Sequence, residues 1–169
     1  CFFEASVRVP FMISWPGRVL PAAHENLVEA VDLLPTLFEL IGLPEPRECQ
    51  GRSLAPLLAG RPYEAREAVF SENVIPEVIT NERLNLPFEK GKGVDGIRHP
   101  DAKKVRTQKW KYVYYPEGYA ELYDLETDPG ERGNLAGQDR VRDVESQMRD
   151  RLLRWLTTAS EADQIAPRW

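Results

Sequence analysis

Thiol and imidazole side chains are common nucleophiles and bases in enzymes, and this chain has two of each. Cys1 is followed by Phe2 and Phe3, and Cys49 lies in a proline-rich connection. A reactive thiol needs a base, a cation or a helix N-terminus close by, whereas apolar surroundings favour an inert one. Both cysteines are therefore interpreted as packing residues. Two cysteines make neither a disulfide framework nor a zinc site, and they leave the redox compartment open.

Arg8, Arg98 and His99 are the candidate contacts for an anionic substrate. Arg98 and His99 are adjacent within a long segment, 73–104, and together they could meet an anion. Arg8 follows Glu4 by four residues, and a charge close to a buried segment usually has a partner. Two interpretations of Arg8 stay open: an ion pair with Glu4 that shapes a bend, or a contact with an anionic substrate.

Acidic side chains are dense between Asp124 and Glu131, where a metal site is the first possibility to consider. The order of the residues does not match the calcium loop of an EF-hand, so turn and capping roles are favoured, with Asp128 in the turn Asp128-Pro129-Gly130. The chain contains no glycine-rich phosphate loop. Taken alone, these residues indicate a fold but no active site.

The composition is that of a globular protein. The 169 residues suit one domain, or a small domain plus part of another, and 42% are apolar and 29% charged. The net charge is −5 and no basic cluster is long enough to follow a phosphate backbone, which argues against nucleic acid as a partner. No apolar run approaches membrane-spanning length, so no membrane contact is expected.

The first third of the chain predicts one strand followed by helices. Residues 7–15 are almost continuously apolar, as in a strand that is covered on both faces. Apolar residues at helical spacing predict a helix over 33–41, with Asp32 as its N-terminal cap and Gly42 as its C-terminal stop. A shorter helical turn is expected over 53–58.

The remainder predicts a small antiparallel sheet and a helix. Short β-branched or aromatic runs separated by turn residues predict strands near 68–71, 105–108, 110–115 and 121–125. Apolar residues at spacings of three and four predict an amphipathic helix near 139–156 that packs on this sheet. The segment 73–104 has weak periodicity, and it either lines a site or is a surface excursion.

These elements predict an α/β chain in two parts, with α+β character. Residues 1–62 are expected to hold the last strand and helices of a large α/β domain. Residues 63–169 are expected to form a small C-terminal subdomain with about four antiparallel strands and the final helix.

Several stretches, in the same order along the chain, resemble motifs of the sulfatases of the alkaline phosphatase superfamily. The resemblance covers Phe3 to about Ala136 and is specific because the motifs occur together. The stretches are Phe3–Pro10 followed by Ser14–Arg18, Val31–Leu37, Gly51–Leu58, Arg106–Tyr112, Glu121–Leu125, Asp128–Glu131 and Asn134–Leu135.

This resemblance implies an alkaline-phosphatase-like fold and hydrolysis of sulfate esters by a formylglycine nucleophile with a divalent cation, usually calcium. Neither Cys1 nor Cys49 fits the C-x-P-x-R motif that carries the formylglycine, and the acidic metal ligands of the family have no match here. The substrate-binding lysine of the family precedes the stretch that begins with Phe3, so it is expected upstream of Cys1. The chain is thus expected to be the C-terminal portion of a sulfatase, inactive alone.

The resemblance also implies partners and leaves alternatives. The expected partners are the N-terminal part of the same sulfatase and a small-molecule sulfate ester, and an oligomer is compatible with the sequence. One alternative is a related phosphonate or phosphodiester hydrolase of the same superfamily. Another is that the isolated chain is a non-catalytic structural module.

Overall fold

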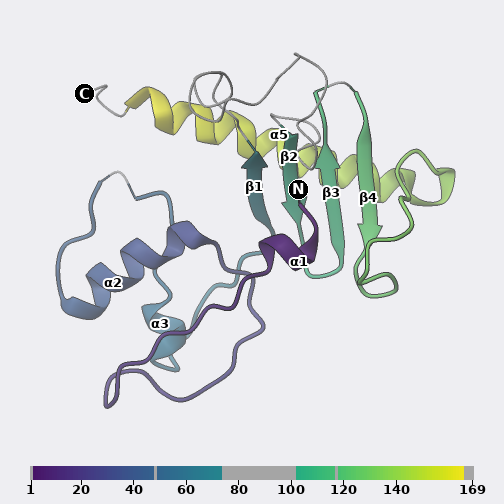
Figure 1. The fold of residues 1–169 in the computed structure, drawn as a ribbon. Coiled ribbons are helices and arrows are strands. Elements are labelled where there is room, and N and C mark those ends of the chain that lie inside the picture. Colours follow the sequence, from purple (N-terminus) through teal and green to yellow (C-terminus); the bar gives the residue numbers. More distant parts are fainter. Residues whose placement is uncertain (1, 48, 74–101, 117, 166–169) are drawn as a thin grey trace, which may run out of the picture. The chain divides into compact units, whose positions relative to one another are not determined.

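The computed structural model describes residues 2–47, 49–73, 102–116 and 118–165 (Figure 1). The chain divides into two compact units. We call residues 1–9 with 70–163 the sheet unit, and residues 10–69 with 164–169 the loop unit. Within the described residues, no helix combines the length and the apolarity needed to cross a membrane.

The sheet unit contains a four-stranded sheet with the strand order β1-β2-β3-β4. β2 pairs with β3, and β3 with β4, in antiparallel register. The β2–β3 connection is closed by Thr107, whose amide donates to the Trp110 carbonyl (2.8 Å) and whose Oγ1 accepts from the Trp110 amide (2.9 Å). The strands are β1 (Val69–Asn73), β2 (Ala102–Arg106), β3 (Trp110–Tyr114) and β4 (Ala120–Asp124).

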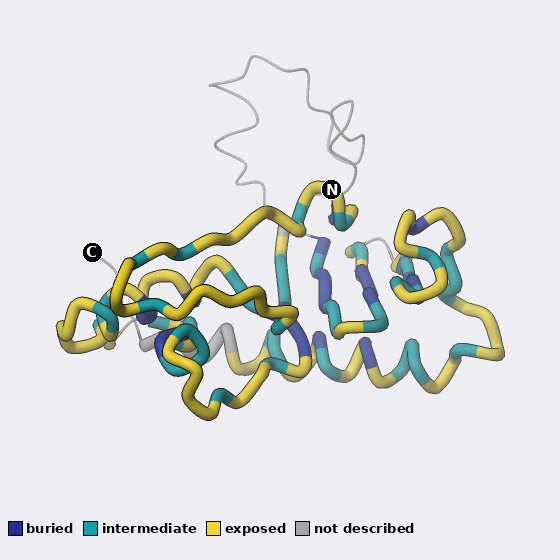
Figure 2. Tube along the Cα trace, turned by 90° about the horizontal axis from the view of Figure 1, so that it is seen from below, coloured by how far each residue is buried: buried dark blue, intermediate teal, exposed yellow. Residues whose placement is uncertain are grey.

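One face of this sheet packs against the helix α5 (Arg142–Ile165), which a short turn, η2 (Asp139–Val141), precedes. The register places Val105, Tyr112 and Leu122 side by side across three strands, and all three are buried. Alternate residues of a strand point to the same face, so this row forms one apolar surface. Met148 and Leu152 are the buried residues of α5, which runs across the sheet (Figures 1 and 2).

The opposite face of the sheet is covered by the N-terminal segment. This segment contains the single-turn helix α1 (Glu4–Val7). Phe2 packs with Ala102 and Val113 in a small buried cluster, and Val7 and Tyr115 lie against it. The predicted antiparallel sheet with a C-terminal helix is therefore confirmed, and the first residues of the chain belong to it.

The loop unit contains η1 (Ala30–Asp32), α2 (Leu33–Ile41) and α3 (Ala55–Leu58). α2 ends at Gly42, which has the left-handed φ of 76° that a glycine tolerates without strain, and the Leu43 amide donates to the Phe38 carbonyl (2.9 Å). This combination closes the last turn of the helix.

Asp32 lies at the start of α2, but its side chain does not cap that helix as the sequence predicts. The carboxylate is fully buried and accepts the amide of Glu29 (2.9 Å) and the amide of Arg52 (2.7 Å). It also forms an ion pair with Arg66. The Asp32 carboxylate is not available as a helix cap because it joins η1 to the later segment around Arg52. Gly51, next to Arg52, lies close to η1: a Cβ at this position would be 2.1 Å from the Val31 carbonyl oxygen.

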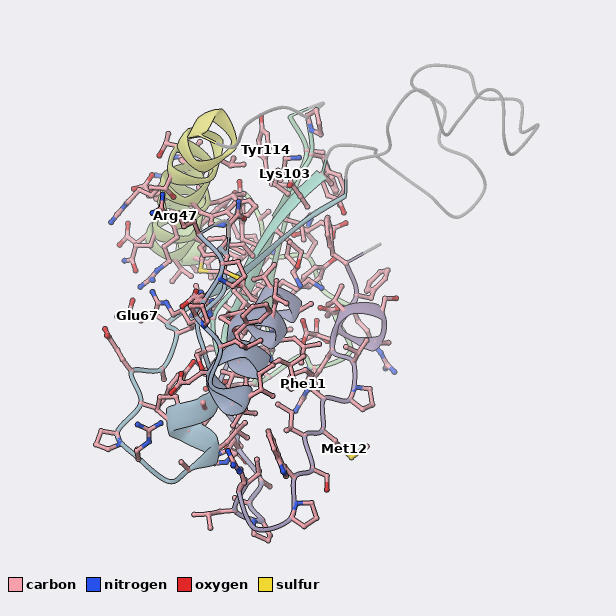
Figure 3. All side chains as sticks on the ribbon, turned by 90° about the vertical axis from the view of Figure 1, so that its left-hand side faces the viewer. Phe11, Met12, Arg47, Glu67, Lys103 and Tyr114 are labelled. Atoms are coloured by element: carbon pink, nitrogen blue, oxygen red, sulfur yellow. The ribbon has the colours of Figure 1, made fainter. Side chains whose placement is uncertain are left out.

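The strand predicted over residues 7–15 is wrong. The segment is extended after α1 but forms no strand, and Val9, Phe11 and Met12 are 69%, 41% and 91% exposed. Figure 3 labels the side chains of Phe11 and Met12 on this segment. A strand exists only when its backbone groups pair with a neighbour. None of the described strands pairs with this segment, so its apolar sequence alone does not make it a strand.

Leu152 and Leu153 provide a matched test of the packing of α5. Leu152 is 2% exposed and Leu153 is 53% exposed. Leu152→Ala is expected to lower the free energy of unfolding by about 2–5 kcal/mol, because a buried leucine leaves a cavity. Leu153→Ala is expected to change it by less than about 0.5 kcal/mol in the same urea titration. Equal losses from both variants would contradict this packing.

Candidate functional site

A buried ion pair between Lys111 and Glu131 lies on the face of the sheet that the N-terminal segment covers. Both side chains are nearly inaccessible, and Lys111 Nζ donates to Glu131 Oε1 and to the Phe2 carbonyl oxygen. The other carboxylate oxygen, Glu131 Oε2, accepts the amide of Glu4 (3.0 Å). Two residues far apart in the sequence therefore hold both ends of the short segment from Phe2 to Glu4.

Glu4 forms a second ion pair, and its partner is not the one that the spacing predicts. Glu4 Oε2 accepts from Arg106 Nε (3.0 Å), whereas Arg8 is exposed and its backbone amide donates to the Glu4 carbonyl (2.9 Å). The reason is that α1 lies against the sheet, where Arg106 is directly beside Lys111 in the register. A partner on the neighbouring strand thus replaces the partner one turn away.

Glu131 is held in an unusual backbone conformation. Its φ is 54°, the one positive φ of a residue other than glycine in the described ranges, and such a conformation costs about 1–2 kcal/mol. The turn before it is fixed by Asp128, whose Oδ2 accepts the amides of Arg132 (2.8 Å) and Gly133 (2.9 Å). The turn and the ion pair with Lys111 together keep Glu131 pointing at the N-terminal segment.

Lys104 completes a group that we call the charged cluster: Glu4, Lys104, Arg106, Lys111 and Glu131. Alternate positions of β2 place Lys104 and Arg106 on the same face, and the register continues this face to Lys111 and Val113. Burial lowers the pKa of Lys104 to about 8. The nearby Glu4 carboxylate opposes this shift, and the Lys111 and Arg106 charges add to it. The cluster therefore contains three cations and two carboxylates.

The residues selected from the sequence are not brought together in the described structure. Arg98, His99 and Cys1 lie outside the described residues, as does most of the segment 73–104. His24 is exposed. Lys109 pairs with both Asp124 (3.6 Å) and Glu126 (2.7 Å), so these two acidic side chains contact a surface lysine at the end of the sheet.

The charged cluster is not evident from the sequence, because its members are up to 127 positions apart (Glu4 to Glu131) and meet only in the folded sheet, its N-terminal segment and the turn at Glu131. One signal was present: charged residues at alternate positions of a predicted strand, at Lys104 and Arg106. No group of histidine, cysteine or acidic side chains suited to a metal ion occurs among the residues that the structure describes.

Comparison with known proteins gives consistent matches. A family model described as N-sulphoglucosamine sulphohydrolase, C-terminal, matches residues 1–74. The chain is 30% identical to a Delta 4,5-hexuronate-2-O-sulfatase of Bacteroides thetaiotaomicron over 95% of this chain and 31% of that protein. It is also 30% identical to arylsulfatase A of Homo sapiens over 80% of this chain and 27% of that protein. The chain spans about a third of the length of these relatives.

The fold is also similar to that of a solved enzyme that is named as a phosphonate hydrolase and not as a sulfatase. The crystal structure of the phosphonate monoester hydrolase of Agrobacterium radiobacter matches with a TM-score of 0.62 and 27% identity. The match covers 80% of this chain and 26% of that chain.

The Lys111–Glu131 pair can be tested with a double-mutant cycle. Glu131→Gln and Lys111→Met each leave a buried charge without its partner, so each is expected to cost about 3–5 kcal/mol of unfolding free energy. The double variant removes both charges and is expected to lose clearly less than the sum of the two single losses. Unfolding by urea, followed by circular dichroism, gives the three values.

Lys109→Met is the control, because Lys109 is exposed and its ion pairs face solvent. It is expected to leave the midpoint of unfolding unchanged. Additive losses in the double variant would show that the two buried charges do not interact.

Proposed function

The chain belongs to the sulfatase family and matches its C-terminal part, and we propose on this basis that the protein containing it hydrolyses sulfate esters. The observation that carries the proposal is the match to a sulfatase along 95% of this chain. Several residues of the family motifs hold together segments that are distant in the sequence. They are Asp32 and Gly51 in the loop unit, and Lys111 and Glu131 in the charged cluster.

We propose that the chemistry itself resides on residues outside this chain. In this family a formylglycine supplies the nucleophile and a divalent cation, usually calcium, offsets the charge of the sulfate. The described residues do not fit a metal ion, and neither cysteine stands in the C-x-P-x-R motif. The partner of this chain is accordingly the N-terminal part of the same sulfatase, and the substrate is a small-molecule sulfate ester.

The proposed role of this chain is to position the segment that leads toward the active site. The charged cluster and the Phe2 packing fix the segment Phe2–Val7 on the sheet, so that residues joined to it have a rigid base. Arg8 follows this segment directly and is exposed, which leaves it accessible to an anionic substrate group. Arg98 and His99 remain proposed substrate contacts. The division into a large-domain part, 1–62, and a subdomain, 63–169, also remains a proposal.

A related activity is the second candidate. The similarity to a phosphonate monoester hydrolase favours hydrolysis of phosphonate or phosphate diesters by the same superfamily fold. The sulfatase proposal is preferred because the sequence matches that cover most of the chain are to sulfatases.

The activity is tested by assaying the protein that contains this chain together with the N-terminal part. It is expected to hydrolyse p-nitrophenyl sulfate faster than p-nitrophenyl phenylphosphonate, and to lose activity on removal of calcium by a chelator. The 169-residue chain alone is expected to release no p-nitrophenol. Turnover by the chain alone would refute the division of roles, and a preference for the phosphonate would favour the second candidate.

The exposed apolar residues of the segment that follows α1 give a separate prediction. Val9, Phe11 and Met12 are exposed on an extended segment, and contiguous apolar surface of this kind marks an interaction site. The isolated chain is expected to bind the dye ANS, and the double variant Phe11→Ser/Met12→Ser to lower its fluorescence by about half. Arg47→Ser, at another exposed position, is the control and should leave the fluorescence unchanged. We propose that the N-terminal part of the sulfatase covers this segment, and a chain that binds no dye would contradict that proposal.

A further inference from the structure

Lys104 is the member of the charged cluster that has no carboxylate of its own. The other two cations each have one: Arg106 Nε is 3.0 Å from Glu4 Oε2, and Lys111 Nζ contacts Glu131 Oε1. Among the described residues, the one contact found for Lys104 Nζ is with the ring of Phe2, 5.9 Å from the ring centroid. This is the outer limit of a cation–π interaction, so it compensates the ammonium group only weakly.

The charge of Lys104 is nevertheless buried. The residue is 2% exposed, and an ammonium group taken out of water without a partner is costly. Burial brings the pKa of Lys104 down to about 8, with the Lys111 and Arg106 charges acting in the same direction and the Glu4 and Glu131 carboxylates acting against it. Lys104 is thus still largely protonated at neutral pH. The cluster then holds one positive charge more than its carboxylates offset.

Neither of the nearest other carboxylate oxygens removes this excess. Glu121 lies on the same face of the sheet, across Val113 from Lys104, but the carboxylates that act most strongly on the pKa of Lys104 are those of Glu4 and Glu131. Glu4 Oε1 is buried and has no hydrogen-bond donor among the described residues, but the charge of that carboxylate is already offset by Arg106. The site as a whole therefore attracts an anion.

We propose that Lys104 is an anion-binding residue, whose ammonium group takes an oxygen of a carboxylate or sulfate group beside Phe2 and Glu4. Oxygen anions match this position because a charge-assisted N–H···O bond supplies the partner that the ammonium lacks. The fixed Arg106–Glu4 and Lys111–Glu131 pairs keep the neighbouring charges in place, so the ligand has to compensate Lys104 alone. This inference does not depend on the proposed hydrolysis.

The test is titration of the 169-residue chain with sodium sulfate and with sodium acetate at constant ionic strength, using sodium chloride as the balancing salt. Binding is followed by NMR through the side-chain Nζ and Cε signals of Lys104 at about pH 7, where its ammonium is charged. Saturable shifts with sulfate are expected, and shifts with acetate would place carboxylates in the same ligand class. The bound anion is also expected to raise the pKa of Lys104 from about 8 toward its ordinary value.

Two neighbouring lysines give a matched pair of variants. Lys103 points to the other face of the sheet, where its Nζ pairs with Glu72 (3.0 Å). Lys104→Met is expected to weaken sulfate binding about tenfold or more, and Lys103→Met to change it less than about twofold. Lys104→Met removes a buried charge without leaving a carboxylate unpaired, so the variant is expected to remain folded.

Three results would overturn the proposal: no saturable shift at Lys104 with either anion, equal sulfate binding by Lys104→Met and wild type, or an equal response to chloride. The last result would mean that the signal reports ionic screening alone. The measurement needs no catalytic turnover, so it stays informative whether or not the protein proves to be a sulfatase.

Discussion

The sheet unit depends on one carboxylate, that of Glu131. Its two oxygens reach the Lys111 ammonium and the Glu4 amide, while Lys111 also holds the Phe2 carbonyl oxygen. A buried carboxylate or ammonium alone would be strongly unfavourable, so each is tolerated only because the other is present and the remaining hydrogen bonds are made. The unusual backbone conformation of Glu131 accompanies these contacts: with a φ of 54° its carboxylate reaches both partners.

The loop unit repeats this arrangement with different residues. Asp32 is fully buried, and its oxygens accept two backbone amides and pair with Arg66. In both units a buried carboxylate thus fastens a segment without regular secondary structure to the elements around it. Such a contact favours one position of the connection, because leaving the buried carboxylate without its partners would be costly. The same constraint makes these positions sensitive to substitution while exposed pairs such as Lys109–Glu126 are not.

Local patterns in the sequence were sufficient for the elements that are stabilised locally. The alternation of β3 and the hairpin to β4 follow from β-branched and aromatic residues around a turn, and the spacing of Met148 and Leu152 indicates the helix that covers them. The order of the motifs along the chain was sufficient to identify the sulfatase family. The prediction of a strand over 7–15 was wrong because a strand needs a pairing partner, which the local sequence does not reveal. For Arg8 the sequence left open an ion pair with Glu4 or a substrate contact, and the structure pairs Glu4 with Arg106 instead. The cluster of Lys104, Lys111 and Glu131 could not be predicted locally, because strand register and the turn at Glu131 bring these residues together.

The central claim is that the Glu131 carboxylate fastens the N-terminal segment to the sheet. Hydrogen exchange at the amides of Glu4, Ser6 and Val7 tests it most directly, because the Glu4 amide donates to Glu131 and the other two donate to the Phe3 carbonyl. In Glu131→Gln these three amides are expected to exchange much faster than in the wild type, while amides between β3 and β4 remain protected. Unchanged protection of the three amides in that variant would contradict the account, because the segment would then be held by its apolar packing alone.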